Sequence, residues 1–556
     1  MDNQMKCRSS HGEQSQRPLK WLPDRKATFA AMILALLSGP LLCQEESQAF
    51  RESVEEILAL SEDADPASML EELEELKVTP VIINCGDEKE ISRLFFLSEF
   101  QVMVLADHIR KNGSVVTLYE LALLPAFDRN TVMLMAPYIS LESAPPKGGK
   151  SYGRTLVTLS ASSRFSGNDS DTEGIRSLLK VKHEQGSFSF GITAENDPGE
   201  PFSFSHAPGA DFLSGYFEYE GKGFVNRIIA GDFSVRAGEG LLFNSSRWMG
   251  SWLSSPSFMS GRSVSAPYTS TEENNFFRGL SITLGSMNAG AVLFASSNKI
   301  DARILFLEDS TAAGVSNLVS GGLHVSESQL EVRNSLTETV AGLRLTAGGE
   351  KVRGGVTAAA TWFSLPFIPD RTQPENLHDF EGDRLINLAA DIRAGTGSVL
   401  FFAEAGLGLS NPRTTITGPE LPDPQADTTL TDRPGQQGGN TGTDPTGSGI
   451  TLLNPGLSDS WAVTAGVRAK PSGRFTFNIL ARHFAPGYHA FHSGAFKAGS
   501  GSGNETGLSA SVHLEAARHL FVTAAADHYR MPWPRYRSSS PSYGSRIEIK
   551  GEYQPR

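Results

Sequence analysis

Three histidines with aromatic neighbours are the first residues in this sequence whose types and spacing could do chemistry. His483, His489 and His492 lie close together, beside Tyr488 and Phe491, and imidazole is a common metal ligand. Aromatic and histidine side chains near the end of a strand, however, more typically mark a membrane–water interface. We therefore predict no metal site and no cofactor for this chain.

A second candidate chemistry is hydrolysis at the rim of a barrel. Asp527-His528 and His206 supply residue types that act as general acids and bases. Gly238-Glu239-Gly240 is an isolated GxG, which suits a turn or bulge better than a ligand loop. The sequence lacks HExxH, Walker A, GxSxG and dinucleotide-binding motifs. We expect that the protein is not an enzyme, and a rim-site hydrolase stays as the weaker alternative.

The elements that must position these residues are strands. A period of two governs most of the chain from Arg154 to Tyr553; in Leu280–Gly285, for example, Leu, Ile and Leu alternate with Ser, Thr and Gly. Each strand therefore has one apolar and one polar face. The chain is only 39% hydrophobic and holds 55 glycines, which suits a barrel with a wet interior because only the outward face must be apolar.

Strand number and length favour a membrane barrel over stacked soluble sheets, which would show the same alternation. We predict about 17 strands, Ala302–Glu308 among them, and most are 8–12 residues long, close to the ~9–11 residues that cross a bilayer at a tilt. Because bacterial barrels usually hold an even number of strands, either a last strand is missing or one predicted strand is wrong. The predicted fold class is mainly β: a large antiparallel transmembrane β-barrel of about 16–18 strands.

The connections between these strands alternate between tight turns and long segments. The short ones should face the periplasm and the long ones the outside. Residues 410–459 are rich in Pro, Gly, Thr and Asp, and we expect a disordered external loop there. Residues 237–276 contain Trp248, Trp252, Phe258 and Tyr268, which suggest an interface or a plug.

The N-terminal region divides into three parts before the barrel at residues 150–556. Basic residues precede the short apolar run Ala27–Leu37, so residues 1–43 are predicted to be a signal peptide, with lipidation at Cys43 as the rival interpretation. Residues 44–78 form an acidic helical segment with twelve acidic residues. With three cysteines in the whole chain, no disulfide framework is expected.

Residues 79–145 are predicted to form a small helical domain. Its expected helices run from the cap Asp87 to Phe95, over Glu99–Lys111, from the cap Thr117, and from the cap Asp128 to about Met135. Glu90 and Glu120 are placed to complete capping pairs with Asp87 and Thr117.

These helices carry a resemblance to a known family. Val81-Ile82-Ile83-Asn84, Leu94–Gln101 and Leu124-Pro125-Ala126-Phe127-Asp128 look like the tandem helix-hairpin-helix module of competence-type DNA receptors. The wider chain resembles bacterial proteins in which such a module precedes a predicted outer-membrane barrel. This resemblance implies DNA contacts at the hairpins, which correspond here to Phe96, Leu97, Ser98, Ala126, Phe127, Asp128 and Arg129.

The hairpin positions depart from the family pattern. Phe96, Ser98, Ala126 and Asp128 stand where the family has glycines whose backbone N–H groups grip a phosphate. Residues 79–142 hold five basic against eight acidic side chains, and DNA affinity depends on neutralising phosphates. A structural or protein-docking module is therefore the preferred interpretation.

Together these patterns predict a Gram-negative outer-membrane barrel with its N-terminal domain in the periplasm. Its role would be a pore, an anchor or a partner-docking platform, with a DNA-binding or DNA-uptake component as the alternative. The expected partners are outer-membrane lipid, a periplasmic protein and, as the alternative implies, DNA. Four arginines are predicted to line the lumen: Arg154, Arg236, Arg468 and Arg482.

Overall fold

The computed structural model describes residues 73–142 and 153–553, except for 164–174, 201–209, 245–263, 411–458 and a few shorter gaps. The shorter gaps are residues 92, 95, 98, 125–126, 128, 222, 287, 323, 350, 397, 473 and 518–519. The predicted signal peptide, most of the acidic segment and most of the connection 410–459 therefore lie outside the described residues, as do His206, Trp248, Trp252 and Phe258.

The described N-terminal part is a helical module whose two ends are joined by a short parallel sheet. Its elements are a helix at residues 73–78, β1 (Val81–Ile82), η1 (Ile83–Cys85), α4 (Glu88–Ile91), α5 (Glu99–Asn112), α6 (Leu118–Ala122), α7 (Arg129–Met135), η2 (Ala136–Tyr138) and β2 (Ile139–Ser140). β1 pairs with β2. Beside this pair, the Asn84 side chain accepts the N–H of Val115 at 2.8 Å and donates to the carbonyl of Leu141 at 2.7 Å.

Most of the predicted helices of this module are confirmed. α5 stops before Gly113, whose φ of +91° is a conformation that glycine adopts readily. The first helix is shorter than predicted, because α4 ends at Ile91. The predicted pair of Thr117 and Glu120 is not formed: Thr117 makes no side-chain cap bond, and Glu120 accepts the N–H of Val116 instead.

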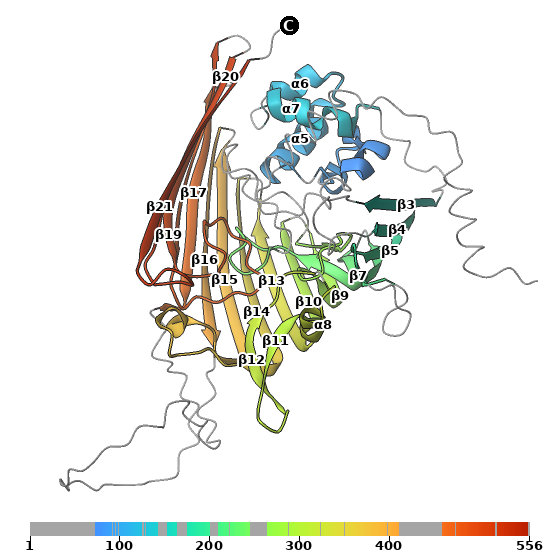
Figure 1. Cartoon of the computed structure of the whole chain (residues 1–556). Helices are drawn as coiled ribbons and strands as arrows, with labels where there is room; N and C mark the ends of the chain where they lie inside the picture. Colours follow the sequence, from blue (N-terminus) through green and yellow to red (C-terminus); the bar gives the residue numbers. More distant parts are fainter. Residues whose placement is uncertain are drawn as a thin grey trace, which may run out of the picture. The chain divides into compact units, whose positions relative to one another are not determined.

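The rest of the described chain contains a mainly antiparallel β-sheet of 19 strands, many of which are labelled in Figure 1. The first strands are β3 (Arg154–Ser163), β4 (Ile175–Gln185), β5 (Phe188–Asn196), β6 (Phe212–Glu220), β7 (Val225–Val235), β8 (Ser265–Pro267), β9 (Phe277–Gly285), β10 (Ala289–Ile300), β11 (Ala302–Phe306) and β12 (Ala312–Leu318). The later strands are β13 (Leu336–Gly348), β14 (Val352–Phe367), β15 (Gly382–Thr396), β16 (Val399–Ser410), β17 (Trp461–Ser472), β18 (Phe475–Phe484), β19 (Glu505–Ala517), β20 (Leu520–Met531) and β21 (Ser542–Tyr553). The helices α8 (Glu327–Val332) and η4 (Pro374–His378) lie in connections.

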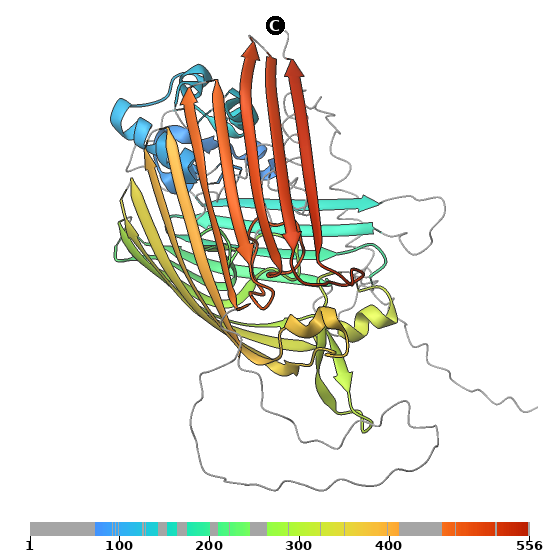
Figure 2. The ribbon, with the colours of Figure 1, turned by 90° about the vertical axis from the view of Figure 1, so that its left-hand side faces the viewer.

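Sixteen of these strands form one continuous ladder. β8 pairs only with the end of β7, and β11 and β12 form a hairpin that touches β14 at one position. The other 16 pair in chain order from β3 to β21, with β7 beside β9 and β10 beside β13. We call this ladder of 16 strands the wall. Figure 2 shows its later strands, yellow to red, side by side.

Two expectations about the sheet need correction. The predicted wall strand Ala302–Glu308 is β11, which pairs with β12 outside the ladder, so the odd count of 17 was wrong and the wall is even-numbered. The expected closed barrel is shown only in part. Among the described residues, no register pairs the edge strand β3 with the edge strand β21.

Connection lengths alternate along the whole ladder, as predicted. Every second pair of strands is joined by a connection of only two to four residues, at 186–187, 221–224, 286–288, 349–351, 397–398, 473–474 and 518–519. All other connections are longer and leave from the opposite ends of the strands. β3 begins and β21 ends at the side of the short connections, because the ladder contains an even number of strands.

The two faces of the wall carry opposite chemistry. In β15, Ile386, Leu388 and Ile392 are 40–52% exposed, whereas Asn387 on the other face is 6% exposed. In β16, Phe401 is 57% exposed and Glu404 is 1% exposed. Apolar side chains therefore cover the outer face, and charged and polar side chains are buried on the inner face.

Candidate functional site

The inner face of the wall is held by ion pairs that join adjacent strands or span the strand between them. Arg344 on β13 binds both carboxylate oxygens of Asp391 on β15, at 2.7 and 3.1 Å. Arg482 on β18 binds both oxygens of Asp527 on β20, at 2.7 and 2.9 Å, and also Glu505 on β19 at 2.6 Å. Bidentate ion pairs of this kind hold in place side chains that could otherwise bind a solute.

A segment of the β7–β9 connection, residues 236–244, packs against this inner face. Glu404 of β16 anchors it: one carboxylate oxygen accepts the backbone N–H groups of Glu239, at 2.5 Å, and Leu241, at 3.1 Å. Gly238 and Gly240 have φ values of +56° and +85°, a backbone form that can turn nearby N–H groups toward one acceptor. A β-carbon at Gly238 would lie 2.5 Å from the Glu404 carboxyl carbon, so the approach requires glycine.

Arg393 of β15 adds a second anchor to the same segment. Its guanidinium donates to Glu239 Oε1 at 2.9 Å and to the carbonyl of Gly238 at 3.2 Å. The anchored segment is thus held to two neighbouring strands of the wall, β15 and β16.

A second inward segment, residues 485–504 between β18 and β19, meets the first. The N–H of Asn244 donates to the carbonyl of His492 at 2.9 Å, and the N–H of Gly494 donates to the carbonyl of Gly240 at 3.1 Å. The Tyr488 hydroxyl donates to the carbonyl of Leu241 at 3.0 Å. Two connections that lie far apart in the sequence therefore form one hydrogen-bonded unit.

Apolar side chains complete the contact between these segments and the wall. Phe243 lies against Phe277 of β9 and Phe294 of β10, with ring centroids 5.8 and 5.4 Å apart. The resulting cluster joins residues 237–243 and 488–495 to inner-face residues of nine strands. The predicted interface or plug stays a prediction, because Trp248, Trp252 and Phe258 lie outside the described residues and Tyr268 packs against Phe276 and Phe212 instead. We call residues 236–244 and 485–504 the inner segments.

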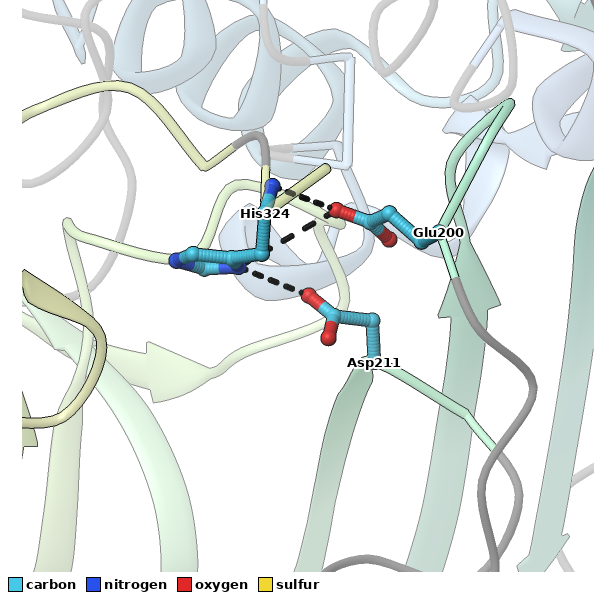
Figure 3. A group of neighbouring side chains, drawn as sticks. All are labelled: Glu200, Asp211 and His324. Carbon is cyan, nitrogen blue, oxygen red and sulfur yellow. Dashed lines mark hydrogen bonds and ion pairs between the residues drawn. The ribbon is translucent and has the colours of Figure 1, made fainter. Parts of the chain in front are cut away.

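A separate charged group lies among the longer connections, outside the strands (Figure 3). His324, before α8, is 3% exposed, and its Nδ1 lies 2.9 Å from Asp211 Oδ2 while its Nε2 lies 2.8 Å from Asp301 Oδ2. Its backbone N–H donates to Glu200 Oε1 at 2.8 Å. The group links the connection after β5 to the connection after β10.

The pKa values in this group follow from burial and from its carboxylates. Burial opposes the charged imidazole, but the hydrogen bonds to Asp211 and Asp301 outweigh it and raise the pKa of His324 to about 10. Burial, with the nearby carboxylate of Asp211, raises the pKa of Glu273 to about 8. Burial also raises the pKa of Glu200.

The same group has the residue types of a metal site. Glu200, Asp211 and His324 offer ligand atoms within 4.8 Å of one another. A ligating imidazole nitrogen must be unprotonated, whereas both ring nitrogens of His324 face carboxylates and the raised pKa keeps both protonated near neutral pH. The geometry therefore favours an ion-paired clasp between connections, which we call the His324 clasp.

The four predicted lumen arginines have different surroundings. Arg482 is fully buried on the inner face, in the ion pairs described above. Arg236 is 6% exposed, and its backbone bridges to Asn244 at the start of the first inner segment. Arg468 on β17 is partly exposed, and Arg154 at the start of β3 is exposed. The structure brings none of them together into one site in the described part of the chain.

Three of the predicted DNA-contact residues belong to the core of the helical module. Phe96, Leu97 and Phe127 are 5%, 0% and 0% exposed, so their side chains pack inward, and the backbone contacts that the resemblance implies stay a prediction. Arg129 begins α7. Ser98, Ala126 and Asp128 lie outside the described residues.

The histidines singled out in the sequence form no common centre. His483 contacts Thr506, His492 contacts Glu338 at 3.1 Å, and burial lowers the pKa of His489 to about 4. Asp527 faces inward to Arg482, whereas the exposed His528 contacts Ser545. Adjacent residues of a strand point to opposite faces, so this pair cannot act on one substrate.

Glu404, His324 and Asp211 were missed by reasoning from the sequence. The contacts of Glu404 span 163 and 165 residues, and the His324–Asp211 contact spans 113. Only the pair of glycines around Glu239 signalled an unusual backbone, and it was interpreted as a turn.

No helix in the described part of the chain is long and apolar enough to cross a membrane.

No family model matches the sequence, and no curated protein matches it. Solved structures that resemble the chain include Pseudomonas aeruginosa OccK2 (OpdF), in complex with glucuronate, with 11% identity and a TM-score of 0.32 over 68% of this chain and 80% of that one. P. aeruginosa OccK9 (OpdG) shows 12% identity and a TM-score of 0.31 over 72% and 87%. The outer-membrane protein OmpT of Vibrio cholerae shows 8% identity and a TM-score of 0.27 over 72% and 94%. Scores this low identify neither a family nor a substrate.

Proposed function

We propose that this chain is an outer-membrane β-barrel that acts as a channel closed at rest. The observation that carries the proposal is the inverted wall, in which Leu, Ile and Phe side chains are exposed on the outer face and ion pairs are buried on the inner face. Burying charges while exposing apolar side chains is costly in water and favourable in lipid.

β21 supports this assignment in its outward residues. Ile547 and Ile549 are 75% and 72% exposed near the middle of the strand, and Tyr543 and Tyr553 are 82% and 68% exposed toward its two ends. An apolar band between two aromatic positions is the pattern of a lipid-facing strand.

The alternating connections suggest the orientation. In outer-membrane barrels the short turns face the periplasm, and the helical module joins the wall at β3 on the side of the short turns. We therefore place the module in the periplasm as a docking domain for a protein partner. Its exposed apolar residues Val116, Tyr119 and Leu123 are 76–84% exposed, which suits a protein partner better than a polyanion.

Closure of the barrel is part of the proposal. An open edge in lipid would leave backbone N–H and C=O groups without partners. β3 and β21 run in opposite directions because the ladder holds an even number of strands, so they can pair in the antiparallel sense. When the inward residues of β3 pair with the inward residues of β21, Val157 and Leu159 lie on the same outer face as Ile547 and Ile549.

Membrane fractionation and gel migration test the barrel. The full-length protein should remain in the outer-membrane fraction after washing with carbonate, and unheated samples should migrate differently from boiled ones. A protein that is released by washing and shows no heat-dependent migration would remove the proposal.

Cysteine cross-linking tests closure in the same membranes. In a Cys85→Ser background, Leu159→Cys is combined in turn with cysteine at the outward positions Ile547, Ile549, Gly551 and Tyr553. At least one outward pair should form a disulfide, and the matched inward positions Glu548 and Lys550 should form none. A uniform lack of disulfides in a heat-modifiable protein would show that β3 and β21 do not meet.

A further inference from the structure

We propose that the inner segment 236–244 is a gate and that Glu404 is the latch that holds it shut; this inference rests on the proposed channel. Glu404 is a wall residue, yet two of its hydrogen bonds go to backbone N–H groups of the inner segment. It makes these contacts across more than 160 residues of sequence.

The geometry of the latch is reversible in principle because it depends on few bonds. A single carboxylate oxygen, Oε2, accepts both N–H groups. Arg482, by contrast, is held in the wall by three hydrogen bonds to Asp527 and Glu505. Two bonds on one oxygen hold the segment less firmly than such a network holds the strands.

The hinge positions of the gate are supplied by glycine. Gly238 and Gly240 flank the latched residue Glu239, and both have positive φ. Residues with this freedom can absorb the backbone change of a moving segment. Arg393 binds the same segment at Glu239 Oε1. Its long side chain can keep this contact when the backbone N–H groups of residues 239 and 241 move away from Glu404.

In the closed state the gate lies against the second inner segment, residues 485–504. The backbone bonds of Asn244 and Gly240 with residues 492 and 494 join the two segments edge to edge. The Asn244 side chain donates to the carbonyl of Gly494 at 3.1 Å, and the Ser493 hydroxyl donates to the carbonyl of Gly240 at 3.2 Å, so both side chains lie where the two segments meet. Cysteines at positions 244 and 493 can therefore be bridged in the closed state by a short bis-methanethiosulfonate linker, which reduction releases.

Planar-bilayer recordings of the full-length protein test the gate with a matched pair of variants. Glu404→Ala should raise the open probability roughly tenfold or more, because it removes two hydrogen bonds that stabilise only the closed state. Glu218→Ala is the control. Glu218 is also a buried carboxylate on the inner face, but its Oε2 accepts the Ser189 hydroxyl at 2.8 Å and its Oε1 lies 2.9 Å from Arg227 Nε, both on neighbouring strands. This control should change the open probability little.

A reversible lock tests the same gate without removing Glu404. In a Cys85→Ser background, Asn244→Cys with Ser493→Cys should lose conductance when the two cysteines are joined by the linker, and reduction should restore it. Equal conductance of the linked and the reduced protein, or equal open probabilities of Glu404→Ala and Glu218→Ala, would overturn the gate.

Heat-dependent migration of every variant separates this outcome from failure of the proposed function. A heat-modifiable barrel with no response to either perturbation refutes the gate alone. Loss of heat modifiability in the wild-type chain refutes the barrel itself. If Glu404→Ala does not fold, the linked cysteine pair at positions 244 and 493 decides the question.

Discussion

The helical module and the sheet bury opposite kinds of residue. In the module, Leu94, Leu97 and Leu105 are fully buried, as in any protein folded in water. In the sheet, Arg482 and Glu404 are buried while Ile547 and Ile549 are mostly exposed. One chain thus contains two regions organised for different solvents, and the difference indicates which part meets lipid.

The largest expected effect comes from breaking a buried ion pair of the wall. Arg482→Ala leaves Asp527 and Glu505 buried without a cation, which should cost roughly 3–5 kcal/mol of unfolding free energy. Denaturant unfolding in micelles measures this change. Arg474→Ala is the control, since Arg474 is 76% exposed and lies 3.6 Å from Glu515. Equal losses of unfolding free energy for Arg482→Ala and Arg474→Ala would show that the buried ion pairs stabilise the sheet no more than a surface pair does.

A core truncation in the helical module should have a somewhat smaller effect that stays local. Leu105→Ala removes a fully buried side chain from α5 and should destabilise the module by roughly 3–4 kcal/mol. Hydrogen exchange of α5 reports the loss, and the heat-dependent migration of the sheet should not change. The exposed Val116→Ala serves as control. Unfolding of the sheet along with the module would show that the two regions are not independent.

Exposed leucines distinguish the two regions most directly. Leu388 on β15 is 40% exposed and Leu123 in the module is 84% exposed. Leu388→Arg should cost roughly 2–4 kcal/mol if that face meets the bilayer, whereas Leu123→Arg meets water and should cost nearly nothing. Refolding into lipid vesicles at increasing denaturant measures both. A harmless Leu388→Arg would mean that the outer face is not in lipid.

The His324 clasp predicts a smaller, pH-dependent effect. The pKa of His324 is raised from 6.5 to about 10 in the folded state, so its stabilisation is complete below pH 6.5 and is lost as the pH rises to about 10. The pKa of Glu273 is raised from 4.5 to about 8 in the folded state. The stabilisation that comes from its protonated form is therefore lost as the pH rises from 4.5 to about 8. Both groups make the clasp weaker as the pH rises.

Hydrogen exchange of residues 324–333, corrected for intrinsic rates, should show this loss of protection between pH 6.5 and 10. His324→Gln should flatten the dependence. An NMR titration of labelled histidine that placed His324 near pH 6.5 would contradict the clasp and reopen the metal interpretation.

Local pattern was enough to predict the strands and their faces. The alternation in segments such as Leu280–Gly285 identified β9, and Gly113 located the end of α5. The same reasoning miscounted the wall, because β11 has the alternation of a wall strand although it pairs only with β12. Alternation reports that a strand has two different faces, and it does not report which strand lies beside it.

The sequence by itself determined the period of two, the outward apolar residues and the alternation of short and long connections, because these depend on neighbours in the chain. The tertiary structure alone decided that residues 236–244 turn inward to Glu404 and that His324 meets Asp211 and Asp301. Those contacts join residues 23 to 165 positions apart. Their partners are selected by the curvature and register of the sheet, and no local spacing in the chain records them.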